Sequence, residues 1–261
     1  MTNKPLTYSS YLRLDGLLSQ QQPLSGEHDE MLFIIIHQVY ELWFKQVLHE
    51  LRAVQAAFEK GDSTRAAPAL KRVLTILKTL VAQIDVLETM TPLSFNSFRT
   101  RLDASSGFQS AQFRELEFLL GHRRAQMAEH YPAGSAERER LGALLKTPAL
   151  YDSFLRYLAA QGYAIPADVL ARDVGTPYAA SAAVQDQLIA VYRDNGFPAQ
   201  LCERLVDLDE GLQEWRYRHV KMVERTIGTK PGTGGSPGAA YLRATLFIPL
   251  FPDLWEIRSR L

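Results

Sequence analysis

The chain lacks several features that would assign it to a well-defined class. It has one cysteine among 261 residues, which excludes an internal disulfide and favours a reducing compartment. Its 29 basic and 29 acidic residues cancel, whereas a protein that binds nucleic acid through phosphate contacts normally carries a basic excess. No apolar run is long enough to span a membrane, and the start, MTNKPLTYSSYLRLDG, lacks the apolar core of a signal peptide. We therefore expect a globular, cytoplasmic protein.

Helical spacing of apolar residues recurs along the chain, while the alternation typical of strands is missing. With 46% hydrophobic residues, residues 1–261 can form a single all-α domain built as a helical bundle. Residues 66–89 have an amphipathic pattern that predicts a helix antiparallel to the one before it. Residues 1–27 predict an N-terminal arm that must pack on another surface. Residues 132–198 alternate short helical pieces with Pro- and Gly-bearing breaks, which predicts a helical excursion from the bundle.

One long helix is predicted from Met31 to Leu51, MLFIIIHQVYELWFKQVLHEL. It contains no Gly or Pro, and its first two turns are apolar on all sides, which indicates burial. His37 lies among these apolar residues. A neutral imidazole is stable there when its ring nitrogens find partners, either as a hydrogen-bonded core histidine or in a chemical role.

A second long helix is predicted from Leu201 to about Ile227. Steps of four and three residues along it place His219 on a core-facing stripe, and two buried histidines on two helices suggest a site between them. The helix ends at Gly228, and the loop TKPGTGGSPG, residues 229–238, can bring backbone N–H groups close to a ligand.

A shorter helix should begin at Thr91-Pro92, where a threonine cap precedes a proline at the first helical position. Arg99 follows Phe95 by four residues, so its guanidinium lies on the same side as a buried ring. An arginine extending over the edge of the core is the plain alternative. Residues 104–108 then lead into a further helix from Ala111 to Leu120.

Several metal and catalytic motifs are missing. None of the six histidines follows a glutamate by three residues, as a di-iron bundle requires, and neither His-Glu-x-x-His nor Cys-x-x-Cys-His occurs. Residues 234–238 spell a hydrolase nucleophile elbow, but a helix precedes them and Pro237 lacks the N–H that an oxyanion needs. Haem held by one histidine with another opposite it is compatible with the spacing. Zinc, a small-molecule site and plain core histidines stay open on the same grounds.

Eight segments resemble the tryptophan 2,3-dioxygenase family. They occur in the family's order and are spread over the whole chain. The segments are Tyr8–Leu14, His28–Gln38, Glu41–Lys45, Leu87–Pro92, Phe95–Arg99, Ser105–Ser110, Trp215–His219 and Gly232–Ser236.

The resemblance implies a cytoplasmic homotetramer with the tryptophan/indoleamine dioxygenase-like fold and one haem b between long helices of each subunit. Such an enzyme uses ferrous haem to insert both atoms of O2 across the indole 2,3 double bond of L-tryptophan, which gives N-formyl-L-kynurenine. His219 matches the proximal iron ligand and His37 the distal histidine that accepts the indole N–H. Arg99 matches the residue that binds the substrate carboxylate, and Thr233 the one that reaches its ammonium group.

The remaining expected site residues also follow from the resemblance. The aromatic residue beside the indole is Phe33, and the pocket wall is expected to include Ile34, Ile35, Ile36 and Phe95. The residues expected beside the cofactor are Ser105, Ser106 and Gly107. The arm residues expected to close a neighbouring subunit's pocket are Tyr8, Tyr11 and Leu12. Two departures stand out: Phe95 replaces a tyrosine found in some members, and Pro237 replaces a frequent serine.

Two other functions fit the same residues. A relative of the family that mono-oxygenates tryptophan or a similar amino acid would need the same pocket. A haem-binding sensor would bind the cofactor without consuming tryptophan.

Overall fold

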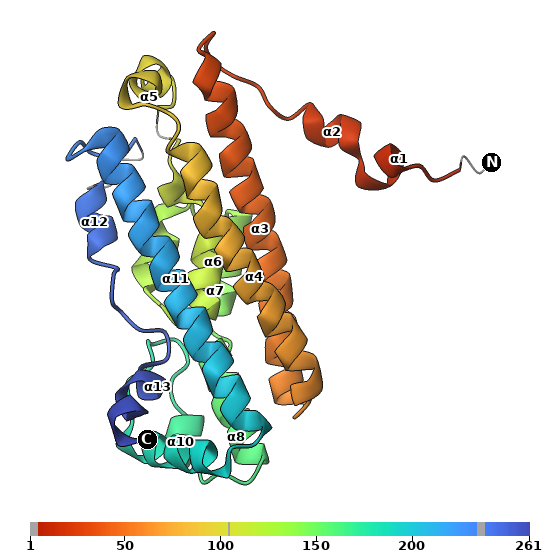
Figure 1. Ribbon diagram of the computed structural model, residues 1–261, viewed down its shortest axis with the longest axis vertical. Helices are drawn as coiled ribbons and strands as arrows, with labels where there is room; N and C mark the ends of the chain where they lie inside the picture. Colours follow the sequence, from red (N-terminus) through yellow and green to blue (C-terminus); the bar gives the residue numbers. More distant parts are fainter. Residues whose placement is uncertain (1–4, 104, 234–237) are drawn as a thin grey trace.

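The computed structural model describes residues 5–103, 105–233 and 238–261, and the described chain is helical without strands (Figure 1), as predicted. Three long helices form the bundle: α3 (His28–Glu59), α4 (Ser63–Leu87) and α11 (Phe197–Ile227). Helices α3 and α11 begin before the predicted positions, and α3 extends two turns further. Both long helices were therefore predicted at the right place in the chain, but with fewer residues than the structure shows.

A tight turn joins α3 to α4 and makes the two helices antiparallel. Gly61 adopts a positive φ of 67°, which a glycine accepts without strain. The side chain of Asp62 then caps α4 by accepting a hydrogen bond from the backbone N–H of Arg65 at 3.2 Å. This short connection fixes the neighbouring packing of two of the three long helices.

The main core lies between these helices and α8 (Leu150–Ala160). Its members are aliphatic and aromatic residues that recur at helical spacing on the inward faces. Fully buried examples are Leu51, Val54, Phe58, Leu70, Val73, Leu80, Phe154, Leu158, Leu201 and Leu205. Each such side chain contributes about 1.5–3 kcal/mol to folding by leaving water, so this core stabilises the packing of the bundle helices.

Short helices continue from the long ones at one end of the bundle. Helix α5 (Pro92–Arg99) starts with the predicted cap, since Thr91 Oγ1 accepts from the Ser94 N–H at 3.1 Å. The 3-10 helix η1 (Gly107–Gln109) and α6 (Ala111–Leu119) follow, and α12 (Ala239–Arg243) packs beside α11 (Figure 1). These pieces surround the upper part of α3 and α11.

Residues 132–198 contain α7 (Ala136–Leu144), α8, α9 (Ala167–Leu170) and α10 (Ala182–Asp194), after the 3-10 helix η2 (Ala125–His130). The buried apolar residues of α8 and α10 belong to the same core cluster as those of the long helices, whereas Leu141 of α7 packs with Phe118, Met127 and Ala128 in a smaller cluster. The C-terminal helices α13 (Pro252–Glu256) and η3 (Ile257–Arg260) also return to the main core. Asp209 anchors them by accepting hydrogen bonds from the backbone N–H groups of Leu250 and Phe251 at 2.7 and 3.2 Å.

The N-terminal segment projects away from the bundle as α1 (Tyr8–Leu12) and α2 (Leu14–Leu18) (Figure 1). Its base is tied to α3, because the Gln21 side chain donates to Gln38 Oε1 at 2.6 Å. The two short helices of the arm, α1 and α2, contain no buried residue. Among the described residues, no helix is both long and apolar enough to cross a membrane.

Candidate active site

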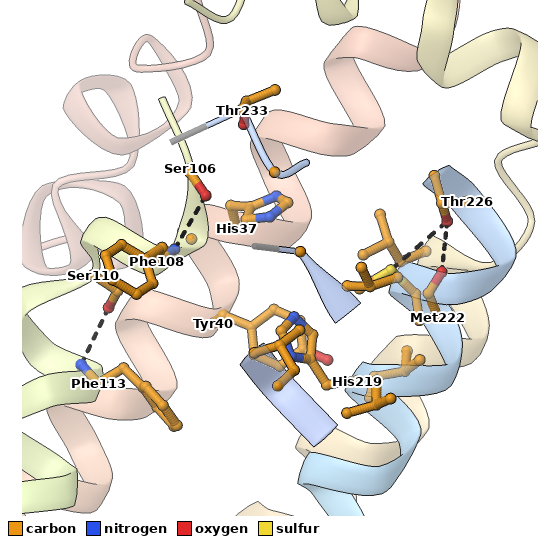
Figure 2. Close-up of a pocket in the computed structure, with 18 of the residues that line it drawn as sticks. His37, Tyr40, Ser106, Phe108, Ser110, Phe113, His219, Met222, Thr226 and Thr233 are labelled. Atoms are coloured by element: carbon orange, nitrogen blue, oxygen red, sulfur yellow. Dashed lines mark hydrogen bonds between the residues drawn. The ribbon is translucent and has the colours of Figure 1, made fainter. Parts of the chain in front are cut away.

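A cavity of about 240 Å³ lies among α3, α5, α6, α11 and the loop after α11. It brings together residues that are far apart in the sequence, among them Phe33, His37, Arg99, His219 and Thr233. Figure 2 shows His37 on α3 and His219 on α11, both at this pocket. The geometry thus places the two predicted histidines on one cavity.

His37 is held in one tautomer by its own helix. Its Nδ1 lies 2.7 Å from the carbonyl oxygen of Phe33, one turn earlier. Because a carbonyl oxygen only accepts, Nδ1 carries the hydrogen and Nε2 keeps its lone pair. Burial lowers the pKa of His37 below its usual value, so the ring is neutral at pH 7. His37 therefore offers the cavity a hydrogen-bond acceptor.

His219 is oriented by an aromatic neighbour. Its ring stacks on the indole of Trp215 one turn earlier, with centroids 5.2 Å apart and planes 7° from parallel. Burial lowers the pKa of His219 to about 4, and the positive charge of Arg216 acts in the same direction. A neutral imidazole in a fixed orientation, facing an apolar cavity, is the form in which histidine binds a metal.

Aromatic rings supply much of the cavity wall near His37. The ring of Phe33 lies 4.1 Å from that of His37 and 5.8 Å from that of Phe95, between centroids. Phe95 and Phe98 pack edge to face at 5.5 Å. Such a wall fits the flat apolar face of an aromatic ligand.

The loop after α11 meets the η1 region at the cavity. Thr233 Oγ1 donates to the backbone oxygen of Ser105 at 2.8 Å, and Arg99 donates to the backbone oxygen of Pro231. Gly238 is required here, since a Cβ at its position would lie 2.7 Å from the oxygen of Lys230. Pro237, which replaces a serine frequent in the family, lies outside the described residues.

The predicted cofactor-side residues Ser105, Ser106 and Gly107 all line the cavity. The Ser106 hydroxyl accepts a hydrogen bond from the Phe108 N–H at 3.3 Å, which helps to hold the turn (Figure 2). A small and partly exposed turn of this kind allows a flat group to approach its backbone.

The described lining of the cavity does not include Ile34, Ile35 and Ile36, so the expectation that they continue the pocket wall stays a prediction. Phe33 and His37 are four residues apart and share the cavity face of α3, so the three residues between them point elsewhere. Ile35 is 41% exposed, and Ile36 is buried in the apolar cluster that also contains Phe95 and Phe98.

The arm residues Tyr8, Tyr11 and Leu12 do not line the cavity of their own chain and are exposed. Their predicted contact concerns a neighbouring subunit and stays a prediction.

Four charged residues on the described cavity wall were not anticipated: Glu41, Arg114, Glu117 and Arg216. Arg216 Nη2 donates to Glu117 Oε1 at 2.9 Å, which joins α11 to α6. The only sequence signal was the spacing of three residues between Arg114 and Glu117, which is equally typical of a solvated helix face.

Comparison with known proteins identifies the family of this chain. The family model described as tryptophan 2,3-dioxygenase matches residues 1–147 and 178–261. The chain is 61% identical to the tryptophan 2,3-dioxygenase of Anaeromyxobacter sp. (strain K), over 98% of this chain and 96% of that protein. It is 58% identical to that of Herpetosiphon aurantiacus, over 99% and 100%. It is 45% identical to that of Bordetella pertussis, over 99% and 92%. The chain belongs to the tryptophan 2,3-dioxygenase family.

Proposed function

We propose that this protein cleaves the indole 2,3 double bond of L-tryptophan with O2 and forms N-formyl-L-kynurenine. The observation that carries the proposal is one apolar cavity with a neutral imidazole on each of two facing helices and a guanidinium at its edge. The relatives that carry the name tryptophan 2,3-dioxygenase support it, because they match this chain over nearly its full length.

We further propose haem b as the cofactor, with His219 as the residue that holds its iron. The fit rests on the ring of His219, which is neutral, fixed by stacking on Trp215 and turned to an apolar cavity. Ser105, Ser106 and Gly107 would border the same group. When bound, ferrous haem supplies the capacity to bind and activate O2, which protein side chains lack.

The substrate contacts follow from the shape and charge of the cavity. Arg99 would exchange its bond to the Pro231 carbonyl for the substrate carboxylate, which a planar guanidinium binds with two parallel hydrogen bonds. The Thr233 hydroxyl lies in the same loop region and would meet the ammonium group. Fixing both charges orients the indole ring in the cavity, and this orientation should supply much of the rate.

His37 would accept the indole N–H through Nε2 and would be flanked by Phe33 and Phe95. The lowered pKa of His37 keeps its ring neutral at physiological pH. Its role is therefore to accept the indole N–H and hold the substrate in position.

Replacing His37 with alanine should weaken activity and leave haem binding intact. One hydrogen bond between neutral groups contributes about 1 kcal/mol, so kcat/KM should fall about fivefold to tenfold. Steady-state kinetics and pigment content of the purified variant measure the two effects. His49→Ala, on an exposed position of the same helix, is the matched control and should change neither. An unchanged kcat/KM for His37→Ala would remove this histidine from the substrate site.

One assay separates the proposed function from its two alternatives. The ferrous protein is incubated with L-tryptophan in air, and the mass of the product is measured. Two added oxygens agree with dioxygenation, one indicates a mono-oxygenase, and unchanged tryptophan indicates a sensor. The His219→Ala protein serves as the blank.

We also propose a homotetramer in the cytoplasm, in which the N-terminal arm closes a neighbour's cavity. Tyr8 and Tyr11 are 76% and 70% exposed in the isolated chain, a large apolar area to leave in water. Their joint replacement by serine should raise KM for tryptophan several-fold and leave pigment content unchanged. Light scattering of the wild-type protein should give the mass of four chains. A monomeric, fully active wild-type protein would contradict the role of the arm.

A further inference from the structure

Glu30 is a buried carboxylate in the first turn of α3, beside the linker of residues 19–27 that joins α2 to α3. Its residue exposure is only 1%. Its Oε1 accepts a hydrogen bond from the Leu24 N–H at 2.7 Å. Its Oε2 accepts one from the Ser25 N–H at 2.8 Å and another from the Ser25 hydroxyl. Both carboxylate oxygens therefore hold the linker.

Glu30 makes these contacts as an anion. Burial disfavours the charged carboxylate, but the hydrogen bonds from Ser25 and Leu24 outweigh it, so the pKa of Glu30 is lowered. Hydrogen bonds to an ionised acceptor are stronger than those between neutral groups. The backbone of the linker is thus fixed at residues 24 and 25 by charge-assisted bonds.

A plainer role for an acidic residue in the first turn of a helix is to stabilise the free N–H groups of that turn. The partners of Glu30 differ from this pattern, because Leu24 and Ser25 precede it by six and five residues and lie outside α3. Asp29 lies in the same first turn and offers a second acidic group to the helix end. The contacts of Glu30 therefore serve the linker.

A second contact holds the other end of the linker, about two turns further along α3. The side chain of Gln38 donates to the backbone oxygen of Gln20 at 3.1 Å and accepts from Gln21 Nε2 at 2.6 Å. Pro23, between the two contacts, has a fixed φ. The linker is therefore held along α3, while α1 and α2 lie away from the bundle (Figure 1).

We infer that Glu30 is a positioning residue, which sets the direction in which the N-terminal arm leaves its own chain and so brings Tyr8 and Tyr11 to the neighbouring subunit's cavity. The inference rests on the proposed function and on the proposed role of the arm. A tethered group acts at a local concentration set by the length and stiffness of its tether. Freeing the linker at residues 24 and 25 lengthens the flexible tether and lowers the concentration of the arm at that cavity.

The test is Glu30→Gln in the haem-loaded full chain. Glutamine has nearly the same shape, but its amide nitrogen would face a backbone N–H of the linker, so two donors would meet. KM for tryptophan should rise several-fold, while kcat and pigment content stay at their wild-type values. Hydrogen exchange of the Leu24 and Ser25 amides should become faster, which reports the lost contact directly.

A double-mutant cycle separates positioning of the arm from a general loss of stability. If Glu30 acts through the arm, Glu30→Gln should raise KM little further in a protein that already carries Tyr8→Ser and Tyr11→Ser. Glu27→Gln is the matched control for charge. Glu27 is exposed and its side chain makes no capping hydrogen bond to α3, so KM should be unchanged.

An unchanged KM in Glu30→Gln would overturn the inference, as would a rise of the same size when the two arm tyrosines are already serine. If Glu30→Gln does not fold, Gln38→Ala takes its place by removing the second contact, and an unchanged KM there overturns the inference. A wild-type protein without tryptophan turnover would refute the proposed function and this inference with it. Turnover by the wild type, with a raised KM in the tyrosine variant but not in Glu30→Gln, would refute this inference alone.

Discussion

His219→Ala should purify with little or no haem. The substitution removes the proposed bond between protein and iron and leaves only the contacts of the cavity wall to hold the cofactor. Changing a residue that merely supports a metal ligand costs about 10–100-fold in affinity, and removing the ligand itself should cost more. The ratio of Soret to protein absorbance per chain measures the loss.

Two further experiments test the same prediction. The alanine leaves a space the size of an imidazole beside Trp215, so free imidazole added with haem should restore part of the pigment. His122→Ala changes a buried histidine that does not line the cavity, and it should retain its pigment if it folds. A His219→Ala protein with full haem content would refute the assignment of the ligand.

Arg99→Ala should have the second largest effect, on tryptophan rather than on haem. A charge-assisted bidentate pair is about twice as strong as a neutral bond, so we expect a loss of about 3 kcal/mol. This corresponds to about a hundredfold fall in kcat/KM, with pigment content unchanged. Arg99→Lys should recover only part of the activity, because an ammonium is a point charge.

The carboxylate contact can be separated from a general effect on the loop. Arg99 also donates to the backbone oxygen of Pro231, so its loss could disturb the loop itself. Tryptamine lacks the carboxylate, and its binding should be the same in Arg99→Ala and wild type. Arg101→Ala, an exposed neighbour, is the control for charge. Equal losses for tryptophan and tryptamine would show that Arg99 acts only through the loop.

Much of the fold could be predicted because long amphipathic helices repeat the helical spacing of apolar residues often enough for the helix to be recognised in the sequence. The periodic apolar residues of α4 and α11 identify both helices, and the Thr91 cap with Pro92 fixes the start of α5. Helix ends were less predictable, because the outer turns of α3 beyond residue 51 carry mixed residues whose burial depends on α8.

The candidate site was only partly predictable for similar reasons. Residues 31–36 of α3 are all apolar, so their pattern does not reveal which face of the helix meets the cavity. Glu117 and Arg216 are 99 residues apart, and their pairing exists only after α6 and α11 pack. The N-terminal arm is exposed within one chain, and its proposed partner is a second copy of the protein, so its contribution to a site does not follow from a single chain.

We propose that His219 holds one haem iron in the cavity that His37 also lines. Crystals of the haem-loaded protein, measured at the iron absorption edge, locate the metal directly in an anomalous difference map. We predict a single strong peak within bonding distance of a ring nitrogen of His219, with His37 across the cavity from it. A peak bound to any other residue, or one outside this cavity, would contradict the account.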